Sequence, residues 1–230
     1  MPKFLFFTMD KIKGIWAVFG KDLKTEFRSR YVVNTVLAFV GASMLLILFS
    51  LRAEQLPPTP KSGVVWIVIL FAALSSLSRS FVMETDRLTY DLLRLHGQAT
   101  EVFLGKLSFN FFFTFFVNLV TFTLYIFLLG IPVSHIGALL LTLVLGTAGL
   151  SGVATMLAAI VSQADRKGAI FSVLSIPLFF PLLLVLIRAT KAALFEGAGG
   201  TFMNDLAALV GYSGVTISAG ILLFDYIWEE

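Results

Sequence analysis

Long apolar runs alternate with short polar stretches along the whole chain, and this pattern is the main signal in the sequence. A helix needs about 20 apolar residues to cross the hydrocarbon layer of a bilayer. Runs of that length predict six membrane-spanning helices, at about residues 31–51, 63–83, 107–130, 136–161, 168–188 and 207–228. Residues 189–206 are too glycine-rich and polar for a further span and predict a loop or a short re-entrant turn. We expect Pro177 and Pro181 to kink the fifth span, because each removes a backbone hydrogen bond.

The N-terminal arm, residues 11–29, has the pattern of an amphipathic helix. Lys13, Lys21, Lys24 and Arg28 project from the side opposite its apolar stripe. A helix of this kind lies in the headgroup layer of a membrane, with lysines near anionic lipid. We therefore expect an interfacial helix, and an arm that merely anchors the first span is the alternative. The apolar stripe consists of Ile12, Trp16, Phe19, Leu23 and Phe27.

A second amphipathic stretch, "ETDRLTYDLLRLHG" at residues 84–97, lies between the second and third spans. Leu88, Leu92 and Leu95 are spaced i, i+4 and i+7, so they share one face of a short helix. Charged residues lie beside that face, and Gly97 stands where the helix would end. These leucines must be buried either on the chain's own bundle or on a soluble partner, and the spacing does not choose between the two.

Polar residues of the third span also share one face, comprising Asn110, Thr114, Asn118, Thr121 and Tyr125. In lipid such groups need partners, so the face predicts interhelical hydrogen bonds or, less often, a polar passage. Small residues predict tight helix contacts in two other spans, one of which could be the seam of a homodimer. They are Gly146, Thr147, Gly149, Ser151, Gly152, Thr155 and Ala159 in the fourth span and Gly211, Gly214 and Ser218 in the sixth.

Composition agrees with a membrane protein and excludes several kinds of site. The chain is 58% hydrophobic and 13% charged, whereas a soluble domain is about 25% charged. With no cysteine, it has no disulfide, no thiolate metal site and no covalent c-type haem attachment. We expect neither a metal site nor a covalently bound cofactor. The net charge of +3 is too small to indicate nucleic acid binding.

The positions of the basic residues predict an orientation. Of the 17 lysines and arginines, 13 fall on one side: seven in residues 3–30, four in residues 79–106 and two at 166–167. The positive-inside rule then places both termini and residues 84–97 in the cytoplasm. The other side holds Arg52, Lys61, Arg188 and Lys191.

The sequence contains neither a nucleotide-binding loop nor a catalytic motif. In "GQATEVFLGKL" seven residues separate the glycines where a P-loop has four, and Leu107 stands where the magnesium-binding Ser or Thr would be. No HExxH or GxSxG motif is present, so we expect no enzymatic activity of this chain. His135, in the outer turn between spans three and four, indicates solvated surface rather than a haem ligand.

The chain resembles the permease subunits of ABC-2-type transporters, and more closely the haem exporter protein B family, the membrane permease of bacterial cytochrome c maturation. The resemblance covers nearly the whole chain, and residues 84–107 are its most specific part. It is carried by "KDLKTEFRSRY" (21–31), the pattern E-x-D-R-L-x-x-D-L-L-R-L (84–95), "FLGKL" (103–107) and "FDYIWEE" (224–230).

The resemblance implies an all-α polytopic permease, a single domain over residues 1–230, in the bacterial inner membrane and as a homodimer. It implies a separate, CcmA-like ATPase that hydrolyses ATP and docks on residues 84–97 as a coupling helix. Further implied partners are a haem-handling CcmC-like subunit, a small CcmD-like membrane subunit and a periplasmic CcmE-like haem chaperone. The implied docking residues are Glu84, Asp86, Arg87, Leu88, Asp91, Leu92, Arg94 and Leu95.

Haem is then either transported or handed over, and the scarcity of haem-ligating residues favours release of a haem-loaded chaperone. Two other functions fit the same pattern of spans. One is an ABC-2 permease for lipid, polysaccharide or drug export, and the other is a membrane scaffold with no transport cycle.

Overall fold

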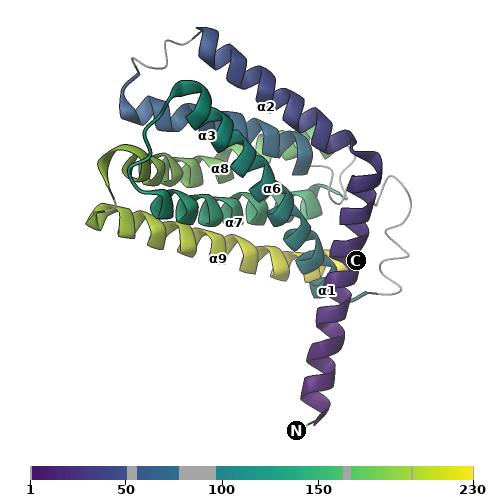
Figure 1. Cartoon of the computed structure of the whole chain (residues 1–230). Helices are drawn as coiled ribbons and strands as arrows, with labels where there is room; N and C mark the ends of the chain where they lie inside the picture. Colours follow the sequence, from purple (N-terminus) through teal and green to yellow (C-terminus); the bar gives the residue numbers. More distant parts are fainter. Residues whose placement is uncertain (1, 51–55, 78–96, 163–166, 198, 230) are drawn as a thin grey trace.

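The chain folds into long helices that run side by side (Figure 1). The computed structural model describes residues 2–50, 56–77, 97–162, 167–197 and 199–229, and every regular element within these ranges is helical. In chain order the elements are α1 (Pro2–Ser29), α2 (Tyr31–Ser50), α3 (Pro58–Leu77), α6 (Ala99–Leu129), α7 (Ile136–Val161), α8 (Lys167–Lys191), the π-helical turn η2 (Ala192–Glu196) and α9 (Gly200–Glu229).

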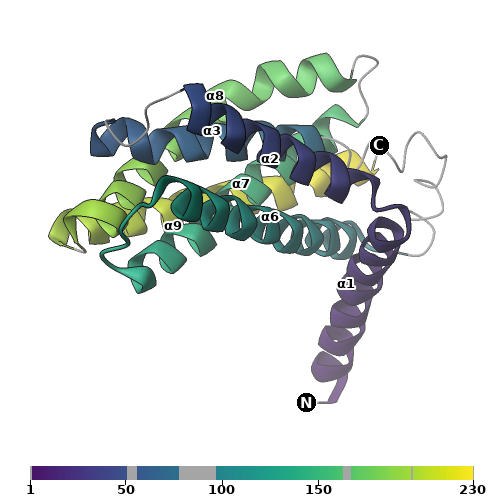
Figure 2. The ribbon, with the colours of Figure 1, turned by 45° about the horizontal axis from the view of Figure 1, so that its top comes forward.

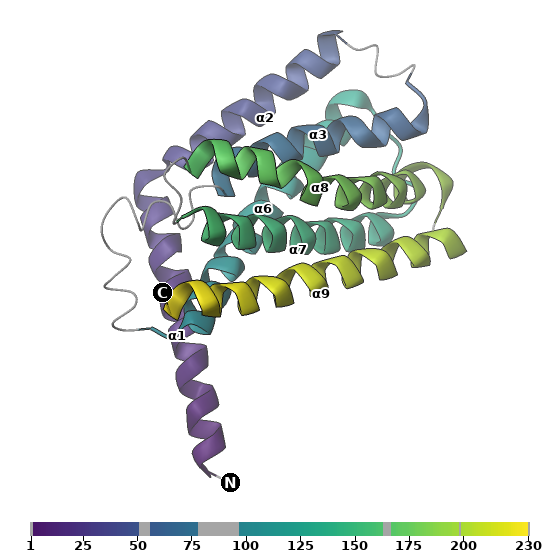
Figure 3. The ribbon, with the colours of Figure 1, turned by 180° about the vertical axis from the view of Figure 1, so that it is seen from behind.

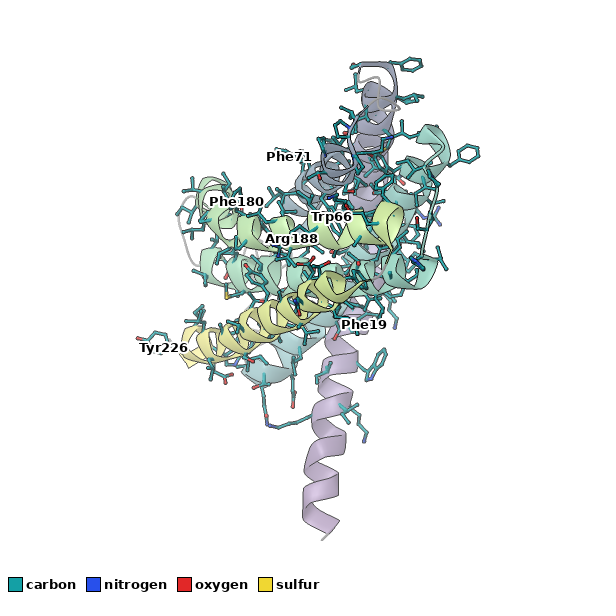
Figure 4. All side chains as sticks on the ribbon, turned by 90° about the vertical axis from the view of Figure 1, so that its left-hand side faces the viewer. Phe19, Trp66, Phe71, Phe180, Arg188 and Tyr226 are labelled. Atoms are coloured by element: carbon teal, nitrogen blue, oxygen red, sulfur yellow. The ribbon has the colours of Figure 1, made fainter. Side chains whose placement is uncertain are left out.

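Six of these helices, α2, α3, α6, α7, α8 and α9, are long and apolar enough to cross a membrane. Large apolar side chains point away from the bundle, including Phe49 and Phe127, which are 83% and 80% exposed. Figure 4 shows Phe71, Phe180 and Tyr226 at the outside, whereas Trp66 lies among the helices and is fully buried. Apolar residues on both faces are expected of a bundle whose outer surface meets lipid. The predicted all-α polytopic fold is confirmed.

Helix α1 does not join the bundle as a further span. It runs steeply across one end of the spans, and its N-terminal half extends beyond them (Figure 1, Figure 2). Arg30, with φ of 51°, makes the corner between α1 and α2. The Glu26 carboxylate accepts a hydrogen bond of 3.1 Å from the backbone N–H of Val33. A carboxylate at this position satisfies a free N–H at the start of α2 and complements the helix dipole.

Helix α7 is the centre of the bundle and lies between α8 and α9 (Figure 3). Its glycines allow α8 and α9 to approach closely. At Gly149, for example, a Cβ would stand 2.8 Å from Leu182 of α8, which is too close for two carbon atoms. A Cβ at Gly152 would likewise stand 3.0 Å from Thr216 of α9. The tight helix contact predicted for the fourth span is therefore present, and it is made within the chain.

The sixth span differs from the fourth in this respect. A Cβ added at Gly211 or Gly214 of α9 would have no neighbouring atom within 4 Å, and Ser218 is exposed. Among the residues described, these three make no close helix contact. The small-residue face of α9 thus points away from the bundle.

The loop or short re-entrant turn predicted at residues 189–206 is too long, because most of these residues belong to helices. Helix α8 continues to Lys191, η2 follows to Glu196, and α9 begins at Gly200. A carbonyl of η2, that of Ala193, accepts a hydrogen bond of 3.1 Å from the N–H of His135 in the turn before α7. The polar residues that suggested a loop are side chains at two helix ends, and Arg188 pairs with Asp205 at 2.8 Å.

Other element bounds also differ from the sequence reading. Helix α6 begins at Ala99 instead of 107, so Lys106 lies inside a helix rather than in a loop. Gly130, with φ of 57°, ends α6 in the left-handed conformation that glycine adopts most readily. Helix α8 continues through Pro177 and Pro181, and the Tyr212 hydroxyl donates to the nearby Leu178 carbonyl.

The close packing of α7 can be tested with two alanine substitutions. A Cβ at Gly146 would stand 2.6 Å from Leu186 and 2.9 Å from the buried ring of Trp66, so we expect Gly146→Ala to destabilise the protein by about 1–3 kcal/mol. Gly41 of α2 has nothing within 4 Å, so Gly41→Ala should be neutral or stabilising, because alanine favours helix. Thermal unfolding in detergent measures both, and equal effects would contradict this packing.

Candidate functional site

The polar face of α6 lies against α7. The Asn110 amide donates to Thr155 Oγ1 at 2.8 Å, and the Asn118 amide donates to Thr147 Oγ1 at 2.9 Å. Both threonine hydroxyls in turn donate to carbonyls of their own helix at 2.6 Å. The two pairs are regularly spaced, because the asparagines lie two turns apart on α6 and the threonines lie two turns apart on the antiparallel α7. The structure therefore uses these residues in helix packing.

The rest of this face is buried as well. Thr114 is 3% exposed, and Thr121 and Tyr125 are fully buried. Thr121 donates to the Val117 carbonyl at 2.7 Å, and the Tyr125 hydroxyl donates to the Lys61 carbonyl at 2.5 Å. All five predicted residues thus point inward, at the contact of α6 with its neighbours.

Two atoms of this face lack a partner. Among the residues described, Thr114 Oγ1 and Asn118 Oδ1 are buried without a hydrogen bond. A buried acceptor without a donor costs about 1–3 kcal/mol. Asn118 therefore contributes less to packing than Asn110, although the two amides make matching interhelical bonds.

The N-terminal arm has three faces where the sequence suggested two. Three residues of the apolar stripe are exposed, namely Ile12, Trp16 and Phe27. Phe19 is partly buried and lies 6.2 Å from Phe112 of α6, measured between ring centroids. Lys13, Lys24 and Arg28 are exposed on a second face, and Leu23 is partly buried.

The third face of α1 packs on the first turns of α6, and the sequence reading missed it. It is formed by Gly14, Val18 and Asp22, four residues apart, and Val18 is 8% exposed. Asp22 pairs with Lys106 at 3.2 Å. The residues were inconspicuous because a glycine, a valine and an aspartate form no pattern until their partner on α6 is known.

Three of the four stretches that carry the family resemblance meet at this end of the bundle. Asp22 belongs to the first, Lys106 and Phe103 to "FLGKL", and Phe224 to the C-terminal stretch, and the rings of Phe103 and Phe224 lie 5.6 Å apart. The C-terminus lies at the same end as α1 in both opposed views (Figure 1, Figure 3). The fourth stretch precedes α6 directly. Its residues Glu84, Asp86, Arg87, Leu88, Asp91, Leu92, Arg94 and Leu95 lie outside the described residues.

The opposite end of the bundle holds His135, Lys61, Arg188 and Lys191. His135 is exposed, and Lys191 pairs with Glu196 at 2.6 Å. The Lys61 ammonium lies 6.0 Å from the centre of the Phe195 ring. Within the described ranges, no group of three or more histidine, cysteine or acidic residues is placed to hold a metal ion. His135 contributes its backbone to the end of α8, as described above.

The unequal pairing of the two asparagines leads to a prediction. We expect Asn118→Leu to destabilise the protein by no more than about 1 kcal/mol, the size of a hydrogen bond between membrane helices. Asn110→Leu should destabilise the protein more than Asn118→Leu does. The Asn118 substitution also removes a buried amide oxygen that has no hydrogen bond, and this offsets part of its cost. Unfolding in detergent compares them. If Asn118→Leu abolished activity at unchanged stability, the face would line a passage instead of packing helices.

Comparison with known proteins identifies the family. The family model described as "CcmB protein" matches residues 13–223. A heme exporter protein B from Pseudomonas aeruginosa is 29% identical over 178 residues, which cover 76% of this chain and 79% of the relative. A heme exporter protein B from Rhodobacter capsulatus is 27% identical over 205 residues, covering 88% of this chain and 92% of that protein. Since the family match extends over nearly the entire chain, this six-span protein belongs to the CcmB protein family.

Proposed function

We propose that this chain is the permease subunit of an ABC-type complex that serves haem delivery for c-type cytochrome assembly. The family match over residues 13–223 carries the proposal, and both relatives are named heme exporter protein B. The six apolar helices support a multi-pass membrane protein.

The proposed location is the bacterial inner membrane, with the α1 end of the bundle in the cytoplasm. Basic residues support this orientation, because 13 of the 17 fall in the segments that the sequence assigns to the cytoplasmic side, the N-terminal arm among them. The position of α1 across the ends of the spans supports an interfacial helix (Figure 2). Its exposed Trp16 and Phe27 would enter the lipid, while Lys13 and Lys24 would face anionic headgroups.

ATP hydrolysis in this proposal belongs to a separate, CcmA-like subunit, because the sequence has no P-loop. Residues 84–97 are the proposed docking helix, with Leu88, Leu92 and Leu95 buried in the ATPase and the charged residues around them. Their place in the chain supports this role, since α6 begins at Ala99, directly after them. Motion of the ATPase would then reach α6 close to its first residue, Ala99.

The proposed step for haem is release of a haem-loaded, CcmE-like chaperone, together with CcmC-like and CcmD-like subunits, rather than passage through this chain. The polar face of α6 is used for pairing with α7, which supports a closed bundle. In the described residues, the outer end has one exposed histidine and no cluster of metal ligands.

We also propose a homodimer. Of the two small-residue faces that could form its seam, the one on α7 is already occupied by α8 and α9. The face with Gly211 and Gly214 on α9 is the one that stays available.

The docking helix can be tested by the double substitution Leu88→Asp with Leu92→Asp. Burying each leucine contributes about 1.5–3 kcal/mol to binding, so the variant should no longer co-purify with the ATPase. It should still insert into the membrane, because both positions lie in the proposed cytoplasmic segment. Cells carrying it should lose mature c-type cytochromes, measured by haem staining.

Charge variants of the same segment provide the matched control. Arg87→Gln and Arg94→Gln should weaken binding much less, because exposed ion pairs contribute at most about 1 kcal/mol. Intact co-purification after the double leucine change would contradict docking on residues 84–97 and would point to the exposed part of α1 as the docking surface. Normal cytochrome levels in cells lacking this chain would contradict the proposed function itself.

A further inference from the structure

Lys106 is a charged side chain buried near the start of α6. Its Nζ lies 3.2 Å from Asp22 Oδ2 of α1, and the two side chains are 1% and 13% exposed. Removing an ammonium group from water is costly unless it stays paired. The pair therefore favours one position of α1 relative to α6, since sliding by a turn would leave Lys106 buried away from the Asp22 carboxylate.

Two glycines bring the helices together at the same place. A Cβ at Gly105 would stand 2.6 Å from Val18 Cβ and 2.9 Å from the Ile15 carbonyl oxygen. On α1, a Cβ at Gly14 would overlap the Glu101 carboxylate. Small residues allow this direct approach of two backbones, as in membrane helix pairs generally. The crossing of α1 and α6 is thus fixed by shape as well as by charge.

The same turns of α6 also contact the end of α9. Thr100 Oγ1 lies 3.4 Å from Asp225 Oδ1, and the Phe103 ring packs on Phe224. We call residues 100–106 the α6 joint. It contacts α1 through Lys106 and Gly105, and it contacts α9 through Phe103 and Thr100. A displacement of the joint must therefore be shared by all three helices.

The α6 joint follows residues 84–97 almost immediately, because α6 begins at Ala99. A helix transmits displacement along its length, whereas a purely apolar contact can slide. A buried ion pair resists sliding, since another register would separate the Lys106 ammonium from the Asp22 carboxylate. The pair thus lies where movement of the docking segment would pass to the arm.

We propose that Lys106, acting through Asp22, is a positioning residue that locks α1 to the α6 joint, so that movement of residues 84–97 carries α1 and α6 as one unit. The inference rests on the proposed function, in which an ATPase moves that segment. It assigns α1 a second role besides lying on lipid: the arm turns with the coupling segment.

Spin labels test the lock without the ATPase. The chain has no cysteine, so cysteines at the exposed positions Ala17 of α1 and Ser108 of α6 carry the only labels. In the full chain in lipid bilayers, Asp22→Asn should give a distance distribution about twice as wide, because the pair is lost. Asp22→Glu should keep it narrow, and so should Lys24→Gln, which removes an exposed charge from the same helix. A narrow distribution in Asp22→Asn would overturn the proposal.

A second measurement separates a coupling role from simple anchoring. The Asp22→Asn complex should still co-purify with the ATPase and hydrolyse ATP, while the yield of c-type cytochromes falls about tenfold, within the range of coupling effects. Asp22→Glu should restore the yield. A normal yield in Asp22→Asn would overturn the proposal. Failure of the unmodified chain to bind any ATPase would instead contradict the proposed function. The spin-label distances would still test the contact between α1 and α6, because they are measured without the ATPase.

A further variant covers the case in which Asp22→Asn does not accumulate in membranes. The double change Asp22→Leu with Lys106→Met removes both charges, and replacing a buried pair by apolar residues is often tolerated. It should fold and show the same widened distances with the same loss of cytochromes. Narrow distances or a normal cytochrome yield in this variant would overturn the proposal.

Discussion

Helices inside a bilayer gain little from burying leucine, because lipid is as apolar as a protein core. The bundle therefore depends on close backbone approach and on paired polar groups, and α7 supplies both. Gly146, Gly149 and Gly152 admit α8, α9 and the Trp66 ring. Thr147 and Thr155 accept the two asparagine amides of α6. Without the glycine contacts or the polar pairs, the remaining apolar contacts of α7 could be replaced by contacts with lipid. Helix α7, which has both, is the most buried of the six spans.

The same two devices recur where α1 meets the bundle. There Gly14 and Gly105 bring the backbones together, and the buried pair of Lys106 with Asp22 fixes their register. The two contacts differ in charge. Helices α6 and α7 pair through neutral amides and hydroxyls, whereas α1 and α6 pair through two charged groups near the start of α6. Separating a buried ion pair is costly because it leaves a charge uncompensated, which suits the movement that we propose this contact transmits.

Much of the fold could be predicted from the sequence, because long apolar runs in a membrane protein have few alternatives to spanning helices. The inward direction of Asn110 and Asn118 followed from their spacing on one face. The two helix ends within residues 189–206 were missed, because polar residues at the ends of helices resemble a loop in sequence. The third face of α1, which packs on α6, was missed. Gly14 and Asp22 form no pattern within α1, and their role is visible only from their contacts with α6.

The account as a whole depends on which side of the membrane the α1 end occupies, since an ATPase can reach residues 84–97 and the α6 joint only from the cytoplasm. Reporter fusions that distinguish cytoplasm from periplasm measure this directly. Fusions after residues 58 and 134 should report the periplasm, and a fusion at residue 230 should report the cytoplasm, as the distribution of basic residues predicts. A periplasmic signal at residue 230 would contradict the account.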